Sequence, residues 1–99
     1  MKSVYPVLFT ETEKGFLIEV PDFEILTQGS DLYDAIKMAR DAIELNCVSF
    51  EDSNKKIPNP SKMGALNIKD CAFAADGNTF VSLVDIDSTR YRRMLDEKV

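Results

Sequence analysis

The stretch YPVLFTETEKGFLIEVPDFEILTQGSDLYDAIKMA, Tyr5–Ala39, decides the fold of this chain. Its first part contains two short runs in which apolar side chains alternate, a pattern typical of β-strands that bury one face. These runs cover about Val4–Thr10 and Phe16–Val20, and Gly15 between them suits the positive φ that such hairpins require. A third short run, Glu24–Gln28, follows, so this part of the chain predicts an antiparallel meander.

A capped amphipathic helix is predicted directly after the meander. Gly29 and Ser30 interrupt the strand pattern, and Asp31 stands at an N-cap position with Asp34 three residues later, similar to a capping box. Apolar residues then recur at spacings of three and four, which places them on one helical face that must cover a sheet. This stripe consists of Leu32, Ile36, Ala39, Ile43, Cys47 and Phe50, and the opposite, wet face is expected to hold Asp34, Lys37, Asp41 and Glu44.

The second half of the chain predicts a loop, a strand and a short helix. Asn54–Gly64 contains two prolines and several polar residues and is interpreted as a loop. The next segment is ambiguous, with a short strand over Ile68–Ala74 as one interpretation. Phe80–Ile86 predicts a strand, and Ser88 is a candidate N-cap for a C-terminal helix.

The predicted order is therefore β-β-β-α-β(-α), an α+β fold. A helical crossover between two strands of one sheet favours their parallel placement. We therefore expect the last strand to lie beside the first, in a small mixed sheet with the one long helix packed across one face.

Composition limits the class of protein. Ninety-nine residues make one domain, residues 1–99, and 44% apolar with 29% charged residues is typical of a soluble globular chain. No apolar run is long enough to span a bilayer and no leader resembles a secretion signal, so we expect no membrane association and a cytoplasmic location. The two cysteines form no CxxC motif and the chain has no histidine, so neither a zinc site nor a disulfide framework is expected.

Charge is unevenly distributed between the two halves. Residues 1–50 contain four basic and nine acidic residues, a net charge of −5, whereas residues 51–99 contain eight of each. An acidic first half argues against nucleic-acid binding by that half and is compatible with a basic partner. A solvated acidic surface that only maintains solubility explains the same pattern equally well.

Several short motifs occur in a fixed order along nearly the whole chain. They are Tyr5-Pro6, Gly15-Phe16, Pro21-Asp22, Gln28-Gly29, Ala35, Ile57-Pro58, Pro60-Ser61, Val84-Asp85 and Tyr91-Arg92. The ordered set resembles the HicB-like antitoxins of bacterial toxin–antitoxin pairs. The resemblance implies a partial ribonuclease H-like (RNase H-like) fold without nuclease chemistry, and therefore a protein that is not an enzyme and needs no cofactor.

The resemblance also implies a partner. Members of this family bind a small basic HicA-like toxin that has a double-stranded-RNA-binding fold and cleaves messenger RNA, and they block its surface. Many members continue into a DNA-binding module after the segment that matches Tyr91-Arg92, whereas this chain stops at Val99. No such C-terminal module is expected here, and DNA binding is not part of the prediction.

Candidate toxin-facing residues follow from charge and position. Glu11, Glu13, Asp22 and Glu24 fall in turns or strand ends of the meander, near one another if the hairpins form, and are suited to pair with the toxin's basic side chains. Tyr33 lies off the apolar stripe and is a candidate apolar anchor. Ordinary surface acids are an equally good interpretation of the four carboxylates.

Two alternatives remain open at this point. The first is an orphan member of the family that forms homo-oligomers through sheet edges, because Pro6 and the short third strand leave an edge whose protection is not visible in the sequence. The second is a metal-dependent nuclease built on Asp22, Asp85 and Asp87, which the absence of an acidic residue on the inner face of the first strand disfavours.

Overall fold

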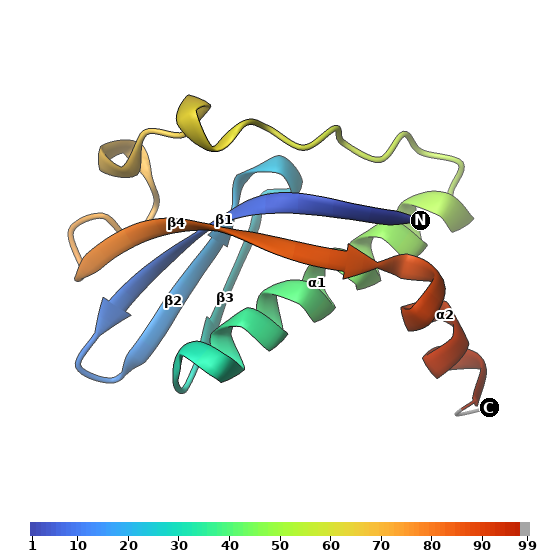
Figure 1. The fold of residues 1–99 in the computed structure, drawn as a ribbon, viewed down its shortest axis with the longest axis horizontal. Helices are drawn as coiled ribbons and strands as arrows, with labels where there is room; N and C mark the ends of the chain where they lie inside the picture. Colours follow the sequence, from blue (N-terminus) through green and yellow to red (C-terminus); the bar gives the residue numbers. More distant parts are fainter. Residues whose placement is uncertain (98–99) are drawn as a thin grey trace.

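The computed structural model describes residues 1–97 of the chain. A four-stranded sheet lies between one long helix and a long connecting segment, and a second, shorter helix projects from the end of the last strand (Figure 1). The strands and helices are β1 (Lys2–Thr12), β2 (Gly15–Val20), β3 (Ile25–Gly29), α1 (Leu32–Asp52), β4 (Asn78–Asp87) and α2 (Ser88–Glu97). Three single turns of 3-10 helix complete the list, η1 (Pro21–Phe23), η2 (Met63–Ala65) and η3 (Ile68–Asp70). The predicted α+β class and the order of its elements are confirmed.

The sheet has the strand order β3-β2-β1-β4, and every neighbouring pair is antiparallel. The predicted position of the last strand beside the first is therefore confirmed, but the parallel direction of this strand, and with it the mixed sheet, is wrong. The reason lies in the connection between β3 and β4. α1 carries the chain away from the end at which β3 finishes, and residues 53–77 then bring it back to that same end, where Asn78 pairs with Glu11.

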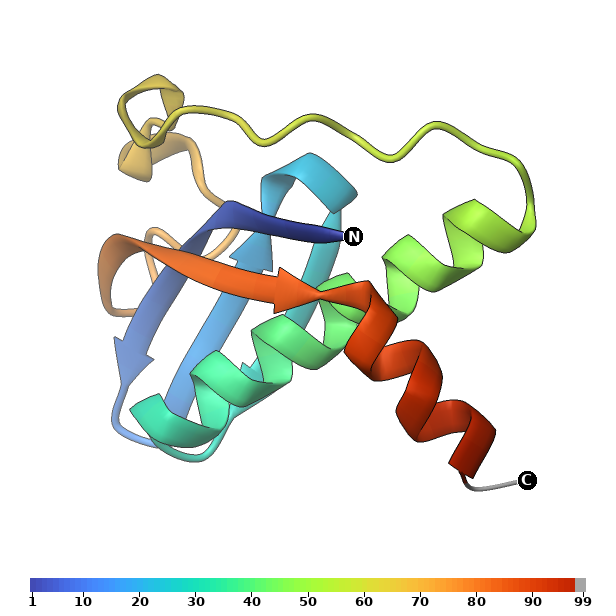
Figure 2. The ribbon, with the colours of Figure 1, turned by 45° about the vertical axis from the view of Figure 1, so that its right-hand side comes forward.

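This returning segment follows the side of the sheet away from α1 (Figures 1 and 2). Three hydrogen bonds hold it there: Tyr5 Oη donates to the carbonyl of Pro58 at 2.7 Å, Ser61 N–H donates to Asp22 at 2.9 Å, and Ala72 N–H donates to Glu19 at 2.9 Å. η2 and η3 lie in this segment, so the interpretation of Ile68–Ala74 as a strand is wrong. One side-chain donor and two side-chain acceptors, on the sheet and on η1, thus fix the path of a segment that has little regular hydrogen bonding of its own.

The core lies between α1 and one face of the sheet. Alternate residues of β1 point into it, and the strand registers place Phe9 opposite both Ile18 of β2 and Phe80 of β4. Tyr5 packs edge-on against Phe23 at a ring-centroid distance of 4.9 Å. The fully buried apolar residues of this core include Tyr5, Val7, Phe9, Ile18, Val20, Ala35, Ala39, Ile43 and Cys47.

The amphipathic helix is confirmed, with two corrections to its faces. Asp31 caps α1 by accepting a hydrogen bond from Asp34 N–H at 2.8 Å. Ala35, not Leu32, faces the sheet in the first turn, since Leu32 is 42% exposed. Glu44 was predicted on the wet face but is only 1% exposed, because α2 packs over it.

Pro6 occupies a position where it costs no sheet hydrogen bond. It lies opposite Leu83 of β4, but the pairing of β1 with β2 begins only at Leu8. The missing N–H therefore falls beyond the end of β2, as expected for a proline in a strand. None of the described helices combines the length and the apolar character that crossing a membrane requires.

Candidate protein-interaction site

Two glycines bring three elements together at one end of the sheet, which we call the hairpin end: the turn Thr12–Gly15, the end of β3 and the start of α1. Gly15 has a φ of +136°, and a Cβ atom there would lie 2.6 Å from the carbonyl oxygen of Gly29. A Cβ atom on Gly29 would in turn lie 2.6 Å from the Cα atom of Ala35. The predicted positive φ of Gly15 is confirmed, and the close approach of β2, β3 and α1 depends on both residues.

An open groove with a volume of about 950 Å³ lies at this end. Its lining combines apolar side chains with three carboxylates and one ammonium group. The lining includes Glu13, Lys14, Phe16, Leu17, Gln28, Ser30, Asp34, Met38 and Asp76. Asp34 is already engaged, since it accepts hydrogen bonds from Ser30 N–H at 2.8 Å and Ser30 Oγ at 3.2 Å. The groove therefore combines apolar side chains with more acidic than basic groups, a composition suited to a basic protein surface.

The predicted toxin-facing residues fall into two separate groups. Glu11 and Glu13 lie exposed at the hairpin end, and Tyr33, in the first turn of α1, is 83% exposed at the same end. Asp22 and Glu24 lie in and just after η1, at the opposite end of β2. At about 3.3 Å per residue, the six residues of β2 separate the groups by roughly 20 Å. The expectation that all four acids lie near one another is therefore wrong, because a hairpin turn and the next turn of a meander lie at opposite strand ends.

Asp22 and Glu24 both have visible roles in the fold. The Asp22 carboxylate accepts hydrogen bonds from Ser61 N–H and from Ser61 Oγ, the latter at 2.5 Å, and so anchors the returning segment. Glu24 adopts a left-handed conformation with φ of 55° and closes η1 by donating its N–H to the carbonyl of Pro21 at 3.2 Å. Asp22 is thus less available to a partner than the exposed side chains of Glu11 and Glu13.

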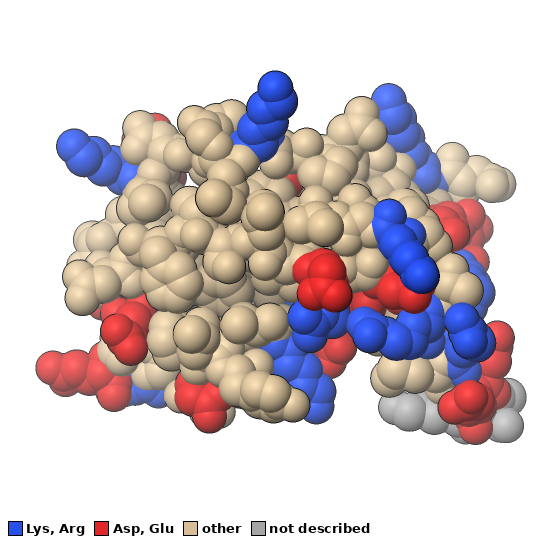
Figure 3. Space-filling view, viewed as in Figure 1, with Lys and Arg blue, Asp and Glu red and all other residues tan. Residues whose placement is uncertain are grey.

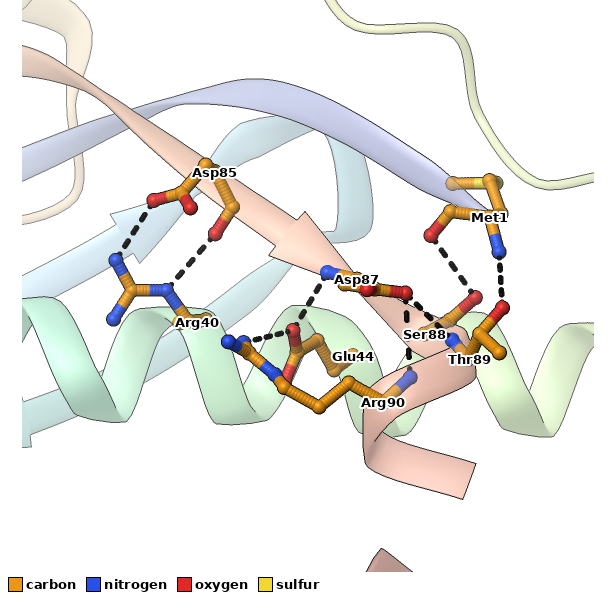
Figure 4. Close-up of polar contacts among 8 residues, drawn as sticks. All are labelled: Met1, Arg40, Glu44, Asp85, Asp87, Ser88, Thr89 and Arg90. Carbon is orange, nitrogen blue, oxygen red and sulfur yellow. Dashed lines mark hydrogen bonds and ion pairs between the residues drawn. The ribbon is translucent and has the colours of Figure 1, made fainter. Parts of the chain in front are cut away.

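A second polar cluster joins β4 to both helices (Figure 4). Arg40 of α1 donates from Nε to the backbone carbonyl of Asp85 at 3.0 Å and pairs with the Asp85 carboxylate at 2.8 Å. One turn later, the buried Glu44 carboxylate accepts hydrogen bonds from Asp87 N–H at 2.7 Å and from Arg90 at 2.9 Å. These contacts fix the direction in which α2 leaves the sheet.

Asp87 caps α2. Its Oδ1 atom accepts hydrogen bonds from Thr89 N–H at 3.0 Å and Arg90 N–H at 3.2 Å. Ser88, the predicted cap, is instead the first residue of α2, and its N–H donates to the carbonyl of Met1 at 2.9 Å. Ser88 Oγ donates to the same carbonyl at 3.4 Å (Figure 4). The hydrogen bond from Arg90 N–H lowers the pKa of Asp87, and the hydrogen bond from the Arg40 side chain lowers the pKa of Asp85.

The three carboxylates of the nuclease alternative do not converge. Asp22 binds Ser61, Asp85 binds Arg40, and Asp87 caps α2. Within residues 1–97, no three histidine, cysteine or acidic side chains gather in a way that suits a metal ion. Each of these carboxylates is thus explained by a contact that stabilises the fold.

The surface over β4 has few charges. Figure 3, which faces β4, shows an uncharged expanse over most of this strand, whereas charged side chains gather toward its end and around α2. The exposed apolar residues of this region include Val4, which is 44% exposed, and Leu83, which is 55% exposed.

Comparisons with known proteins place this fold. No protein-family model matches the chain. Two curated relatives from Photorhabdus laumondii subsp. laumondii match about three-fifths of it: Antitoxin HicB 2, which is 36% identical over 61 residues, and Antitoxin HicB 1, which is 37% identical over 62. A chain of a toxin–antitoxin complex from Streptococcus pneumoniae superposes with a TM-score of 0.80 at 25% identity, covering 92% of this chain and 73% of that one. The chain is therefore similar in sequence to HicB antitoxins and similar in fold to a chain of a toxin–antitoxin complex.

A second solved structure agrees in fold. A chain of the HicA3 and HicB3 toxin–antitoxin complex superposes with a TM-score of 0.66 at 23% identity, covering 86% of the present chain and 99% of that one. The match with this chain spans 44% and 40% of the lengths of the two curated relatives, which is less than half of each.

Sequence reasoning missed two residues that hold β4 against the helices. Glu44 has the helical position of a wet-face residue, and its burial depends on α2, which is distant in sequence. Arg40 reads as an ordinary helix cation, but it bonds the outer edge of β4. Glu44 lies three residues before Cys47 of the apolar stripe, a spacing that places it beside the buried face, and this was the one available signal.

Proposed function

We propose that this chain is an antitoxin domain that binds a small HicA-like ribonuclease toxin and neutralises it by covering its surface, without catalysing a reaction. The observation that supports this most is the superposition on a chain of a toxin–antitoxin complex over 92% of the present chain at a TM-score of 0.80. The engagement of Asp22, Asp85 and Asp87 in structural contacts agrees with a non-catalytic role.

The hairpin end is the proposed contact surface. Glu11 and Glu13 would attract a basic toxin during the encounter, and Tyr33 would supply an exposed aromatic anchor. The groove beside them adds apolar side chains, including those of Phe16 and Met38. Asp22 and Glu24 would contribute only through a second, separate contact, since they lie at the other end of β2.

Binding to the product of the neighbouring reading frame, which this proposal expects to be a small basic protein, tests it. Co-expression should rescue growth, and mixing kinetics should give a complex whose association slows about tenfold at low salt in the double variant Glu11→Lys, Glu13→Lys, with a smaller change at high salt. The double variant Asp70→Lys, Asp96→Lys, which changes exposed acids on η3 and α2, is the charge-matched control. Failure of the wild-type chain to bind or to rescue growth would remove the antitoxin role, whereas salt-independent association would remove only the electrostatic part.

Tyr33 requires a separate measurement. Tyr33→Ala should weaken equilibrium binding at least tenfold, mainly through faster dissociation, because an anchor acts after the encounter. Leu26→Ala is a suitable control, since Leu26 is 59% exposed on β3. An unchanged dissociation rate in Tyr33→Ala would move the contact away from the hairpin end. An antitoxin of a messenger-RNA-cleaving toxin would act in the cytoplasm, which remains the predicted location.

Self-association is the second candidate, with or without a toxin. It is favoured by the outer edge of β4, a ten-residue strand with no neighbour on that side. Light scattering of the purified chain over a range of concentrations tests it: a molar mass that stays at 11.1 kDa at every concentration would exclude it.

A further inference from the structure

The outer edge of β4 is divided into a closed part and an open part. The carbonyl of Asp85 accepts from Arg40, and the N–H of Asp87 donates to Glu44, so both residues direct their backbone groups away from β1. In an antiparallel strand, alternate residues direct both backbone groups to the same side. Thr79, Val81 and Leu83 therefore also direct theirs outward.

No described side chain or loop bonds these outward groups of Val81 and Leu83, in contrast to Asp85 and Asp87. An edge of this kind is a template for another strand unless charge, proline or a covering element protects it. Between Asn78 and Val84 the strand contains no charged residue and no proline. η2 and η3 lie near β4 but do not bond the outward backbone groups of Val81 and Leu83, and hydrogen-bonded protection of the edge begins at Asp85, where Arg40 binds.

We propose that a second copy of this chain pairs with this edge, β4 against β4 in antiparallel orientation, joining the two sheets into one. The inference gives a surface and a register to the self-association proposed above and does not depend on a toxin. A twofold axis through Val81 would pair Val81 with its copy and Thr79 with Leu83 of the other chain. The ladder would stop at Asp85, because Arg40 already occupies that carbonyl.

Charge selects a second copy over a basic partner strand. A chain with a net charge of −5 meets itself with least repulsion along an uncharged segment, and Asn78–Val84 is such a segment. A basic partner would instead be attracted to the acidic side chains that line the groove at the hairpin end. Antiparallel edge pairing is also self-complementary, as a twofold interface requires, and Val81 would meet an identical β-branched side chain, a favourable cross-strand pair.

The exposed side chains of β4 allow a matched test by light scattering and sedimentation. Wild-type chain should show a dimer that forms with rising concentration, and Leu83→Lys should raise its dissociation constant at least tenfold. Leu26→Lys should leave that constant unchanged, since Leu26 is 59% exposed and Leu83 55% exposed on opposite edge strands. A dimer that survives Leu83→Lys, or that is lost equally in Leu26→Lys, would overturn the proposed surface and leave self-association standing.

Cross-linking tests the register. In a Cys71→Ser background, Val81→Cys should form an intermolecular disulfide on mild oxidation, because directly paired residues have Cα atoms about 5.5 Å apart. Leu83→Cys should not, since the two copies of residue 83 would lie about 13 Å apart along the strands. Efficient cross-linking through Leu83→Cys without Val81→Cys would refute the register. A wild-type chain that remains monomeric at millimolar concentration would refute the whole interface while leaving the antitoxin proposal intact.

Discussion

The two parts of the outer edge of β4 differ in what α1 supplies to them. At residues 85–87, Arg40 and Glu44 reach the strand and bond its outward carbonyl and N–H groups. Over residues 79–83, no described residue does so, and the strand is uncharged. α1 therefore protects the edge of β4 only where it carries long polar side chains close to the strand. The outer edge of β4 is therefore hydrogen-bonded to α1 at one end of the strand and available for pairing at the other.

Burial strengthens the hydrogen bonds of the closed part of the edge. Glu44 is 1% exposed, and its carboxylate accepts from both a backbone N–H and a guanidinium group. Charge-assisted hydrogen bonds of this kind stabilise more than neutral ones, and a buried carboxylate without partners is strongly unfavourable. The junction of β4, α1 and α2 is thus specified by one acidic side chain.

The largest expected effect is a difference in alkylation rate between the two cysteines. Cys47 is buried in the core one turn beyond Glu44, and burial, with a smaller contribution from Glu51, raises its pKa to about 11. Cys71 is partly exposed, with its Sγ atom 3.9 Å from Thr79 Oγ1 at the open part. Iodoacetamide at pH 8 should modify Cys71 at least about a hundredfold faster than Cys47, since only the thiolate reacts.

Mass spectrometry of a labelling time course measures this contrast, with Cys71→Ser as the control that isolates Cys47. The raised pKa also disfavours the folded state in alkali. Its contribution to stability is complete below the ordinary thiol pKa of about 8.5 and is lost as the pH rises toward 11. Equal labelling rates for the two cysteines would show that the closed part opens readily.

Removal of the buried carboxylate should have the next largest effect. Glu44→Leu leaves Asp87 N–H without its acceptor and Arg90 without its pair, and should lower the free energy of unfolding by about 2 kcal/mol. The half-exposed Arg90 can turn to solvent, which keeps the cost below that of a fully buried pair. Urea unfolding measures the loss of unfolding free energy in Glu44→Leu. Glu51→Leu, whose pair with Arg92 is partly exposed, should cost less than about 0.5 kcal/mol, and equal costs would contradict this account.

Removal of the ion pair between Arg40 and Asp85 should have a smaller, pH-dependent effect on the free energy of unfolding. Arg40→Gln should lower the free energy of unfolding at pH 7 by about 1 kcal/mol, since the Asp85 side chain is largely exposed and its pairing is screened. Arg40 lowers the pKa of Asp85 in the folded state, so the stabilisation is present above pH of about 4 and is lost as the pH falls through the lowered pKa.

Urea midpoints at pH 7 and pH 3 measure this second effect, and the gap between wild type and Arg40→Gln should narrow at the lower pH. Arg93→Gln on the exposed side of α2 is the matched control. A gap that is constant with pH would assign the effect to the bond with the Asp85 carbonyl alone.

The smallest effect on folding is expected in the open part. Leu83→Lys should change the free energy of unfolding by less than about 0.5 kcal/mol, measured at a concentration at which light scattering finds only monomer, because Leu83 is 55% exposed. Leu26→Lys should behave alike in this assay. A cost near that of Glu44→Leu would mean that Leu83 belongs to the core, and that its exposed edge is not free for pairing.

Local patterns predicted most of the elements. The alternation in β1 and β2, the positive φ of Gly15 and the cap at Asp31 are each set by residues within a few positions of one another, and all are confirmed. The sequence defines the two faces of α1 less sharply, because a neighbouring element can bury residues at the margin of the apolar stripe. Glu44 lies on that margin and α2 covers it.

The candidate site was predictable only in its ingredients. Exposed acids at Glu11 and Glu13 and the aromatic Tyr33 could be proposed from the sequence, but their separation from Asp22 and Glu24 follows from the length of β2. The role of Asp22 also depends on Ser61, 39 residues away. Contacts at such separations leave no periodic signal in one sequence.

The sequence by itself determined the strands, the helices and their α+β order, because hydrogen bonding and apolar periodicity act between near neighbours in the chain. Tertiary structure alone decided the direction of β4, the burial of Glu44 and the division of the β4 edge. Each of these depends on where residues 53–77 return the chain and on where α1 lies against the sheet. Those positions are set by packing between segments far apart in sequence, which local patterns do not encode.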